Sequence, residues 1–139
     1  MRIKQLHPNF IMPAKSTERA GAFDIYMSTA GYTSGLPTKV MLGFATEIPE
    51  NHVALILPRS GVGSKYGIEL NNTCGVIDSD YRGEWAAFIK TKDDRYYQWE
   101  AGDRLLQFLI VPIAEVTLEL VEELSITNRD SKGFGTTGK

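Results

Sequence analysis

The chain contains many short apolar runs, and turn-forming residues interrupt them before any can build a long helix. There are 13 glycines and 6 prolines among the 139 residues, spread along the whole sequence. HVALILP (52–58) alternates with a period of two, GEWAAFIKTK (83–92) is a moderate strand pattern, and RLLQFLIVPI (104–113) is nearly continuous, as in a strand buried on both faces. Short strands separated by turns predict one all-β domain, a barrel or a sandwich.

Residues 114–124 (AEVTLELVEEL) continue this pattern, because Val116, Leu118 and Leu120 alternate with other side chains as in a further strand. The one plausible helix is a turn or two within SGVGSKYGI (60–68), which is rich in glycine.

The last segment, residues 125–139, has only Ile126 and Phe134 as sizeable apolar residues. Burial of two side chains does not offset the entropy of ordering such a length of chain. We therefore expect a β-domain over residues 1–124 and a flexible C-terminal arm over 125–139. The arm carries Arg129, Lys132, glycines and one aromatic ring, which suit contacts to negative charge, phosphate oxygens and a flat base. A tail without a role is the alternative.

Composition excludes several classes of function. The net charge of −2, with lysine and arginine scattered, offers no general attraction to nucleic acid or to an anionic membrane. No apolar run approaches the roughly 20 residues that span a bilayer. The single cysteine, Cys74, excludes an internal disulfide and indicates a reducing compartment, so we expect a cytoplasmic protein.

Two polar segments are candidates for chemistry. In GVIDSDYRGEW (75–85), Asp78 or Asp80 could act as a general base for water, although Asp, Ser and Gly also favour a plain hairpin turn. In PRSGVGSKYG (58–67), a cation, a hydroxyl and glycines directly follow an apolar strand, which suits an anion-binding loop or simply a connection.

Covalent catalysis and zinc binding find little support. His7 and His52 have no evident Ser or Cys partner, and Cys74 is more typical of a small buried residue than of a nucleophile. No Cys/His spacing fits zinc. The available oxygen ligands favour Mg²⁺ that arrives with phosphates.

Five segments together resemble, in order, the five motifs of the trimeric dUTP pyrophosphatases (dUTPases). They are AGAFDIY (20–26), PRSGVGSKYGI (58–68), GVIDSDYRG (75–83), GDRLLQ (102–107) and RDSKGFGTTG (129–138). Such enzymes hydrolyse dUTP to dUMP and pyrophosphate, lowering dUTP and supplying dUMP for thymidylate synthesis. The resemblance implies that Asp78 activates the attacking water and accepts the deoxyribose 3′-hydroxyl, and that the Tyr81 ring leaves no room for a 2′-hydroxyl.

The same resemblance implies a hairpin slot that reads the uracil edge. The residues that would form it are Asn72 and the backbone of Gly75, Val76 and Ile77, with Ala86 behind. A tight slot rejects thymine by its methyl group and cytosine by its reversed donors and acceptors.

The triphosphate would be held by the second and fourth motifs. Ser60 would lie near the α–β bridging oxygen, and Asp103 is expected to fix a neighbouring arginine rather than touch substrate. The residues implied to contact phosphate are Arg59, Ser60, Gly61 and Gln107.

Magnesium and the arm complete the implied site. Asp24 would hold Mg²⁺ through water, with the ion chelated by the substrate phosphates. Arg129 would meet the γ-phosphate, Phe134 would stack on uracil, and Gly135 and Thr136 would add further contacts.

Family members are homotrimers of jelly-roll-like β-subunits with exchanged C-terminal arms and shared active sites, which we expect here. Asp130 and Lys132 stand where the family usually has glycine, so the arm is stiffer and more charged. Two alternatives remain: a dCTP deaminase of the same fold, and a regulatory protein that signals dUTP to a partner, as some phage-encoded members do.

Overall fold

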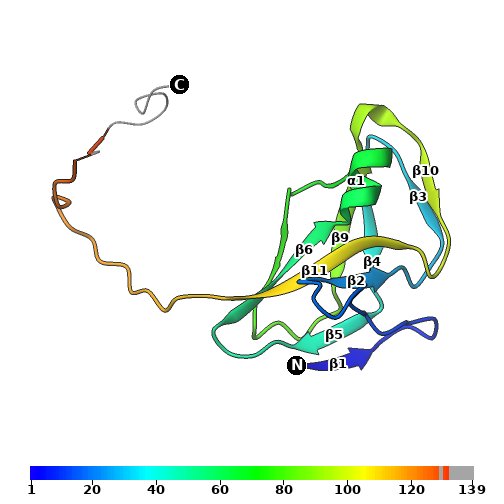
Figure 1. Ribbon diagram of the computed structural model, residues 1–139, viewed down its shortest axis with the longest axis horizontal. Coiled ribbons are helices and arrows are strands. Elements are labelled where there is room, and N and C mark those ends of the chain that lie inside the picture. The colour runs from blue at the N-terminus through cyan, green and yellow to red at the C-terminus, as the bar shows by residue number, and fades with distance from the viewer. Residues whose placement is uncertain (129, 132–139) are drawn as a thin grey trace.

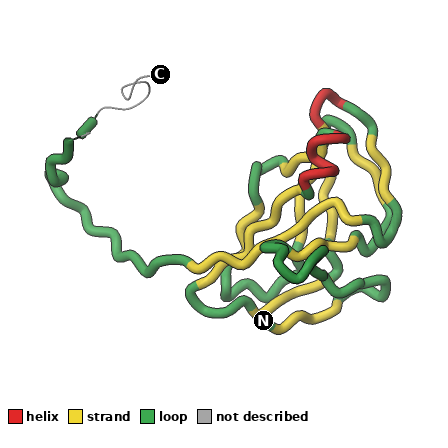
Figure 2. Tube along the Cα trace, viewed as in Figure 1, coloured by secondary structure: helices red, strands yellow, loops and turns green. Residues whose placement is uncertain are grey.

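The computed structural model, which describes residues 1–128 and 130–131, confirms an all-β jelly-roll-like subunit with one short helix (Figure 1). Its strands are short (Figure 2), and strands that are neighbours in a sheet are never consecutive in the chain. The elements are β1 (Arg2–Gln5), β2 (Phe23–Tyr26), β3 (Gly31–Thr33), β4 (Thr38–Met41), β5 (Phe44–Glu47), β6 (His52–Pro58), α1 (Ser60–Tyr66), β7 (Ile68–Leu70), β8 (Gly75–Ile77), β9 (Ala86–Thr91), the 3-10 turn η1 (Lys92–Asp94), β10 (Tyr97–Trp99) and β11 (Arg104–Pro112).

The largest sheet has the order β2-β11-β6-β8, and a second has the order β4-β9-β7. Two ribbons, β1-β5 and β10-β3, complete the layers. All pairs are antiparallel. β6 and β11 lie at the centre of the large sheet and pair along seven positions, from Leu106 opposite Pro58 to Pro112 opposite His52. These are the two runs that the sequence marks as strands most clearly.

The core lies between the sheets and is built around aromatic side chains. Trp85 packs against Phe44 and Phe108, with ring centroids 5.0 and 5.1 Å away, and all three are fully buried. Tilted and edge-on aromatic pairs of this kind stabilise a core beyond the area that they bury. The strand predicted at 83–92 is therefore shorter in the structure, Ala86–Thr91, because Trp85 turns into the core ahead of it.

The helix prediction at 60–68 is confirmed with slightly earlier bounds, Ser60–Tyr66. Gly67 ends the helix in a left-handed conformation with φ of 70°, and its N–H bonds the Gly63 carbonyl. Within the described part of the chain, no helix is long and apolar enough to cross a membrane.

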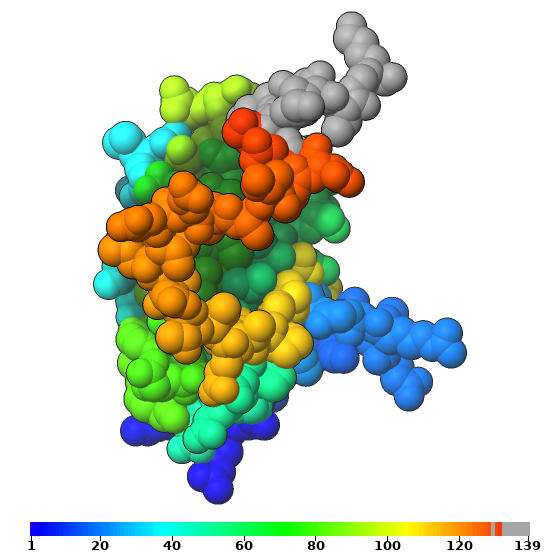
Figure 3. Space-filling model, turned by 90° about the vertical axis from the view of Figure 1, so that its left-hand side faces the viewer, coloured from blue at the N-terminus to red at the C-terminus, as the bar shows by residue number. Residues whose placement is uncertain are grey.

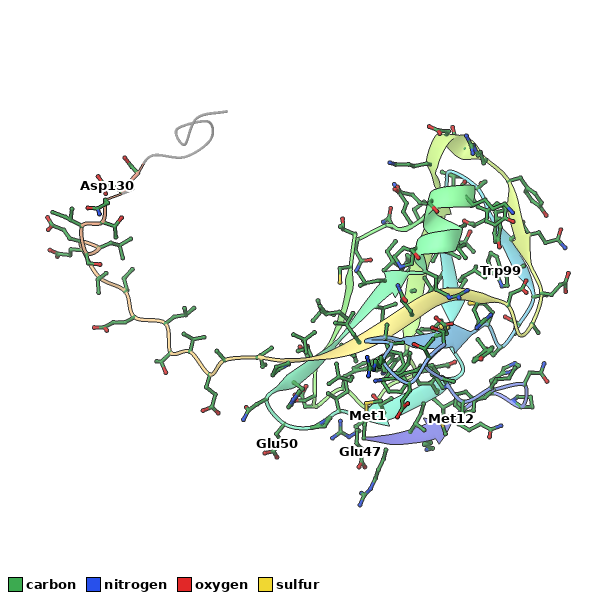
Figure 4. The ribbon with its side chains drawn as sticks, viewed as in Figure 1. Met1, Met12, Glu47, Glu50, Trp99 and Asp130 are labelled. Atoms are coloured by element: carbon green, nitrogen blue, oxygen red, sulfur yellow. The ribbon has the colours of Figure 1, made fainter. Side chains whose placement is uncertain are left out.

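The predicted strand at 114–124 does not form. The last strand ends at Pro112, and residues 113–128 are exposed and leave the body as an extended segment (Figure 1). Figure 3 looks from the side to which this segment extends, and the segment (orange) crosses the front of the view. Figure 4 shows Asp130 at its far end, away from the body. A division between domain and arm at residue 124 stays a prediction.

Candidate active site

The first group of predicted site residues surrounds a buried carboxylate. Asp24 on β2 is only 5% exposed, and each of its oxygens accepts a hydrogen bond from a guanidinium. Arg59 Nε lies 2.8 Å from Oδ1, and Arg104 Nη1 lies 3.1 Å from Oδ2. A buried carboxylate needs such partners to remain charged. Asp24 therefore fixes two arginines at one edge of the molecule.

The sheet brings these residues together from distant parts of the chain. Gln107 on β11 stands opposite Asp24 in the register with β2, and its side-chain amide donates to the Pro58 carbonyl at 3.1 Å. Arg59 follows β6 directly, and its backbone N–H bonds the Leu105 carbonyl at 2.9 Å. The guanidinium and amide groups thus converge where β6 ends and α1 begins.

Ser60 and Gly61 open α1 beside these groups, and both are exposed. Nothing lies within 4 Å of the position that a Cβ on Gly61 would take. The loop surface is consequently open to a ligand at the positions predicted to contact phosphate.

A polar hollow of about 320 Å³ adjoins the arginines. Its lining residues are Arg59, Tyr97, Gly102, Asp103, Arg104 and Leu105. Burial raises the pKa of Tyr97, and the charge of Asp103 raises it further, so this phenol stays neutral in the physiological range.

Arg59 and Arg104 pair with Asp24 and Arg129 lies outside the described residues, so the arginine-fixing role predicted for Asp103 stays a prediction. The Asp103 Oδ2 accepts the backbone N–H of Glu100 at 2.9 Å, which closes the turn before β11. Arg104 was not singled out from the sequence, because a partner 80 positions away leaves no local signal.

The second group of site residues forms a small pocket of about 230 Å³. Its lining residues are Val76, Ile77, Asp78, Tyr81 and Ala86. All five are predicted site residues. Asp78 is exposed and lines this pocket, whereas Asp80 is not among the lining residues. The volume is below the roughly 300–1,000 Å³ of complete ligand pockets, so the pocket holds only part of a nucleotide.

The backbone beside this pocket has free hydrogen-bonding groups. β8 pairs with β6 on one side only and forms the edge of the large sheet. An edge strand presents a row of N–H and C=O groups that can bind another molecule. Gly75 packs closely there, since an added Cβ would lie 3.2 Å from Cβ of Ile56.

The turn that joins β7 in one sheet to β8 in the other is held by the side chain of Asn72. The Asn72 side-chain nitrogen donates to the Cys74 carbonyl at 3.0 Å, and Thr73 has a φ of 68°, which is unusual for a β-branched residue. Asn72 lies at the predicted slot but outside the pocket lining.

One subunit does not bring the two groups into one site. Asp24 lies on β2 and Asp78 directly follows β8, and these strands form opposite edges of the four-stranded sheet. Three strand spacings of about 4.8 Å separate them by about 14 Å. The remaining predicted site residues, Arg129, Phe134, Gly135 and Thr136, lie outside the described residues.

The described residues contain no group of three or more His, Cys, Asp or Glu side chains that could hold a metal ion. Asp24 already accepts from two guanidiniums, whose positive charges oppose direct binding of a cation. A metal ion bound directly to Asp24 would have to compete with these two ion pairs.

Comparison with known proteins gives a consistent result. The family model described as dUTPase matches residues 8–138. The chain is 38% identical to the deoxyuridine 5′-triphosphate nucleotidohydrolase of Syntrophotalea carbinolica, covering 99% of this chain and 96% of that one. It is 36% identical to the enzyme of the same name from Nautilia profundicola, covering 100% and 99%.

Solved structures agree with the sequence relatives. The Staphylococcus bacteriophage 80alpha dUTPase with dUpNHpp superposes with a TM-score of 0.90 at 28% identity, covering 99% of this chain and 98% of that one. The dUTPase of phage phi11 of S. aureus, described with a structural Mg(II) ion, has a TM-score of 0.78 at 27% identity, covering 88% and 96%.

Proposed function

The chain belongs to the dUTPase family, and from this premise we propose how its residues hydrolyse dUTP to dUMP and pyrophosphate. One observation carries the proposal: the pocket beside β8 combines an exposed carboxylate, Asp78, with an aromatic ring and an unpaired strand edge. These are the groups needed to activate water, to exclude a ribose and to read a base. The family match also sets aside the dCTP deaminase alternative.

The uracil ring binds along β8. Uracil presents an acceptor, a donor and an acceptor along one edge, which suits the alternating N–H and C=O groups of an unpaired strand. Ala86 leaves space behind the base that a larger side chain would fill. The Asn72 side chain uses its nitrogen in the turn, and within residues 1–128 and 130–131 its oxygen accepts no hydrogen bond.

Catalysis uses Asp78 as the general base. The carboxylate takes a proton from a water molecule as the water oxygen bonds to the α-phosphorus. The bond from the α-phosphorus to the α–β bridging oxygen breaks, and pyrophosphate leaves with the electron pair. Positioning and charge neutralisation lower most of such a barrier, so no covalent intermediate is needed.

The phosphates lie against the other group of residues. Asp24 holds Arg59 in place, so that its guanidinium is a fixed positive charge for the triphosphate. Ser60 and Gly61 are exposed beside it and offer further polar groups. Gln107 is oriented toward the same end of β6 by its bond to Pro58. Mg²⁺ would neutralise phosphate charge, and its contact with the protein is the water-mediated one to Asp24.

We propose a homotrimer because the two groups of residues are too far apart to serve one substrate within a subunit. Residues from one subunit then meet Asp78 and Tyr81 of another, and the arm of a third subunit carries Arg129, Phe134, Gly135 and Thr136 to the same site. These four residues lie outside the described part of the chain, so their roles rest on the family resemblance alone.

The segment 114–124 supports association between subunits. Its Val116, Leu118 and Leu120 are exposed, with Leu118 at 95%, and such an apolar stripe indicates a surface that is covered in an assembly. Its alternation suits a strand that pairs with an unpaired edge of a second copy.

The free edge of β1 has charged and apolar surfaces that suit residues 114–124 of a neighbouring subunit. A hollow of about 400 Å³ beside it is lined by three basic residues, Arg2, Lys4 and Arg82, and one acid, Glu47, so its net positive charge is opposite to that of the glutamates of the segment. Another hollow of about 360 Å³ is apolar, and it includes Met1 and Met12, which lie near one another in Figure 4. We therefore place the segment of a neighbouring subunit here.

The regulatory alternative rests on the phage dUTPases, which are described as controlling the transfer of virulence genes. That description applies to the phage proteins and not to this chain. No feature of the described residues favours it.

The test combines substrate range with one pair of variants. The protein is incubated with Mg²⁺ and dUTP, UTP, dCTP or dTTP, and the products are separated by ion exchange. We expect dUMP and pyrophosphate from dUTP alone. Asp78→Asn should lower kcat by about 10²- to 10⁴-fold while dUTP still binds, and Asp80→Asn should retain activity. If Asp78→Asn is fully active, or if activity is lost only in Asp80→Asn, the general base is Asp80.

A further inference from the structure

The aromatic ring of Tyr81 is held by the residues that follow it in its own loop. Its hydroxyl donates to the backbone carbonyl of Glu84 at 3.2 Å, and its backbone N–H closes a turn with the Asp78 carbonyl at 3.2 Å. The ring lies directly against Gly83. A Cβ built on this glycine would be 2.4 Å from Oη, 2.5 Å from Cζ and 3.0 Å from Cε2 of Tyr81.

Gly83 is required by the tyrosine and not by its own backbone. Its φ lies outside the left-handed region, unlike that of Gly43, Gly67 and Gly102. The backbone conformation therefore does not demand glycine, and the three atoms nearest to an added Cβ all belong to the Tyr81 side chain. Tyr81 is 45% exposed, so an added methyl group can push the ring toward solvent without deforming the fold.

Glu84 anchors the same loop to the body of the domain. While its backbone carbonyl accepts from Tyr81, its side-chain Oε1 accepts the backbone N–H of Gly43 at 3.0 Å. Gly43 lies in the turn between β4 and β5 with a φ of 81°, and a Cβ there would be 3.0 Å from Oγ of the buried Ser28. The tyrosine hydroxyl is thus bonded to a residue that is itself fixed to a packed turn.

We propose that Gly83 and Glu84 are positioning residues that set the preference for deoxyribose over ribose through Tyr81. Gly83 lets the ring lie flat along the loop, and the Glu84 carbonyl holds its outer end, so the ring forms a fixed wall of the pocket that Asp78 lines. A wall that moved outward would admit a 2′-hydroxyl. The inference rests on the proposed role of Tyr81 as the group that excludes ribose.

The experiment measures kcat/KM for dUTP and for UTP, because a purely structural defect lowers both and leaves their ratio unchanged. Gly83→Ala should lower the dUTP/UTP ratio by at least about tenfold, the range in which a pocket discriminates one added group. Gly35→Ala is the matched control, because a Cβ there would also meet a side chain, that of Asp94, which belongs to neither group of site residues, and its ratio should equal that of the unmodified protein.

Tyr81→Ala and the double variant separate the possible causes. Tyr81→Ala should lower the ratio, and adding Gly83→Ala to it should have no further effect, because the ring that the methyl group displaces is already gone. Tyr81→Phe keeps the ring and loses the bond to Glu84, so its ratio should fall between those of Tyr81→Ala and the unmodified protein. This variant also serves if Gly83→Ala does not fold.

The outcomes are distinguishable. A normal ratio in Tyr81→Ala would refute the proposed exclusion of ribose by this ring, and the inference with it. A lowered ratio in Tyr81→Ala with normal ratios in Gly83→Ala and Tyr81→Phe would leave the ring as the selective group and overturn the positioning roles. An equal effect of Gly83→Ala with and without the tyrosine ring would also overturn them.

Discussion

Asp24→Asn tests whether one buried carboxylate organises the phosphate-binding side of the site. The substitution preserves shape and removes the charge that Arg59 and Arg104 share. The asparagine oxygen can still accept from one guanidinium, but its NH₂ group then faces the other, donor against donor. One of the two arginines is therefore expected to lose its fixed position.

The size of the effect follows from burial. A hydrogen bond between charged groups contributes about 1.5–3 kcal/mol, and breaking a fully buried pair costs about 3–5 kcal/mol. The Asp24 side chain is 7% exposed, but those of Arg59 and Arg104 are 28% and 41% exposed, so water compensates part of the loss. We expect the free energy of unfolding to fall by about 2 kcal/mol, which lowers Tm by about 6–10 °C for a chain of this length.

Glu47→Gln is the matched control. It makes the same chemical change in the Arg2–Glu47 pair, whose N–O distance is also 3.1 Å but whose side chains are 86% and 49% exposed. Exposed pairs contribute about 0–1 kcal/mol, so its Tm should change little.

Thermal unfolding is followed by circular dichroism at one protein concentration, since assembly makes Tm depend on concentration. Turnover of dUTP is measured on the same samples, and kcat/KM should fall in Asp24→Asn alone. Equal Tm values for the two variants, with full turnover in both, would refute the organising role of Asp24.

Three further outcomes are expected. Gly31→Ala should lower the free energy of unfolding by about 1–3 kcal/mol in chemical denaturation, because its Cβ would lie 2.5 Å from Cζ2 of Trp99, which is buried and held by its own hydrogen bond. Unchanged stability would contradict this packing. Leu118→Asp should convert trimers to smaller species in analytical ultracentrifugation while the fold remains, and an intact trimer would exclude this residue from the interface. Ala86→Leu should raise KM for dUTP by at least about tenfold with little change in Tm, because the added atoms fill the small pocket beside Asp78, and an unchanged KM would place the base elsewhere.

The sequence predicts well those strands whose apolar pattern follows directly from their place in the sheet. β6 and β11 are central strands of the large sheet, and their apolar runs match their observed bounds closely. β3 and β7, by contrast, have three residues each, which is too short for a period of two to stand out from chance.

The site is predictable as a set of residues and less so as a set of contacts. Asp78 and Tyr81 are named from one contiguous motif, and the structure places both on one pocket. Among the described residues, the acid that pairs with Arg59 and Arg104 is Asp24 on β2, whereas Asp103 lies in the turn before β11. That pairing is decided by sheet register, which joins Asp24 to Gln107 across more than eighty residues of sequence.

Residues 114–124 show why a correct pattern can give a wrong element. Alternation of Val116, Leu118 and Leu120 reports that one face must be buried, but it does not report against which chain. Within the subunit, β2 and β6 already pair with β11 on its two sides, and after a last backbone bond from Ile113 to Asn51 the continuing chain leaves the body without joining a sheet. A hydrophobic stripe that the subunit cannot cover has to be covered by association or it becomes a risk of aggregation. The same alternation that predicted a strand of the domain is therefore better explained as a strand that forms only between copies of the chain.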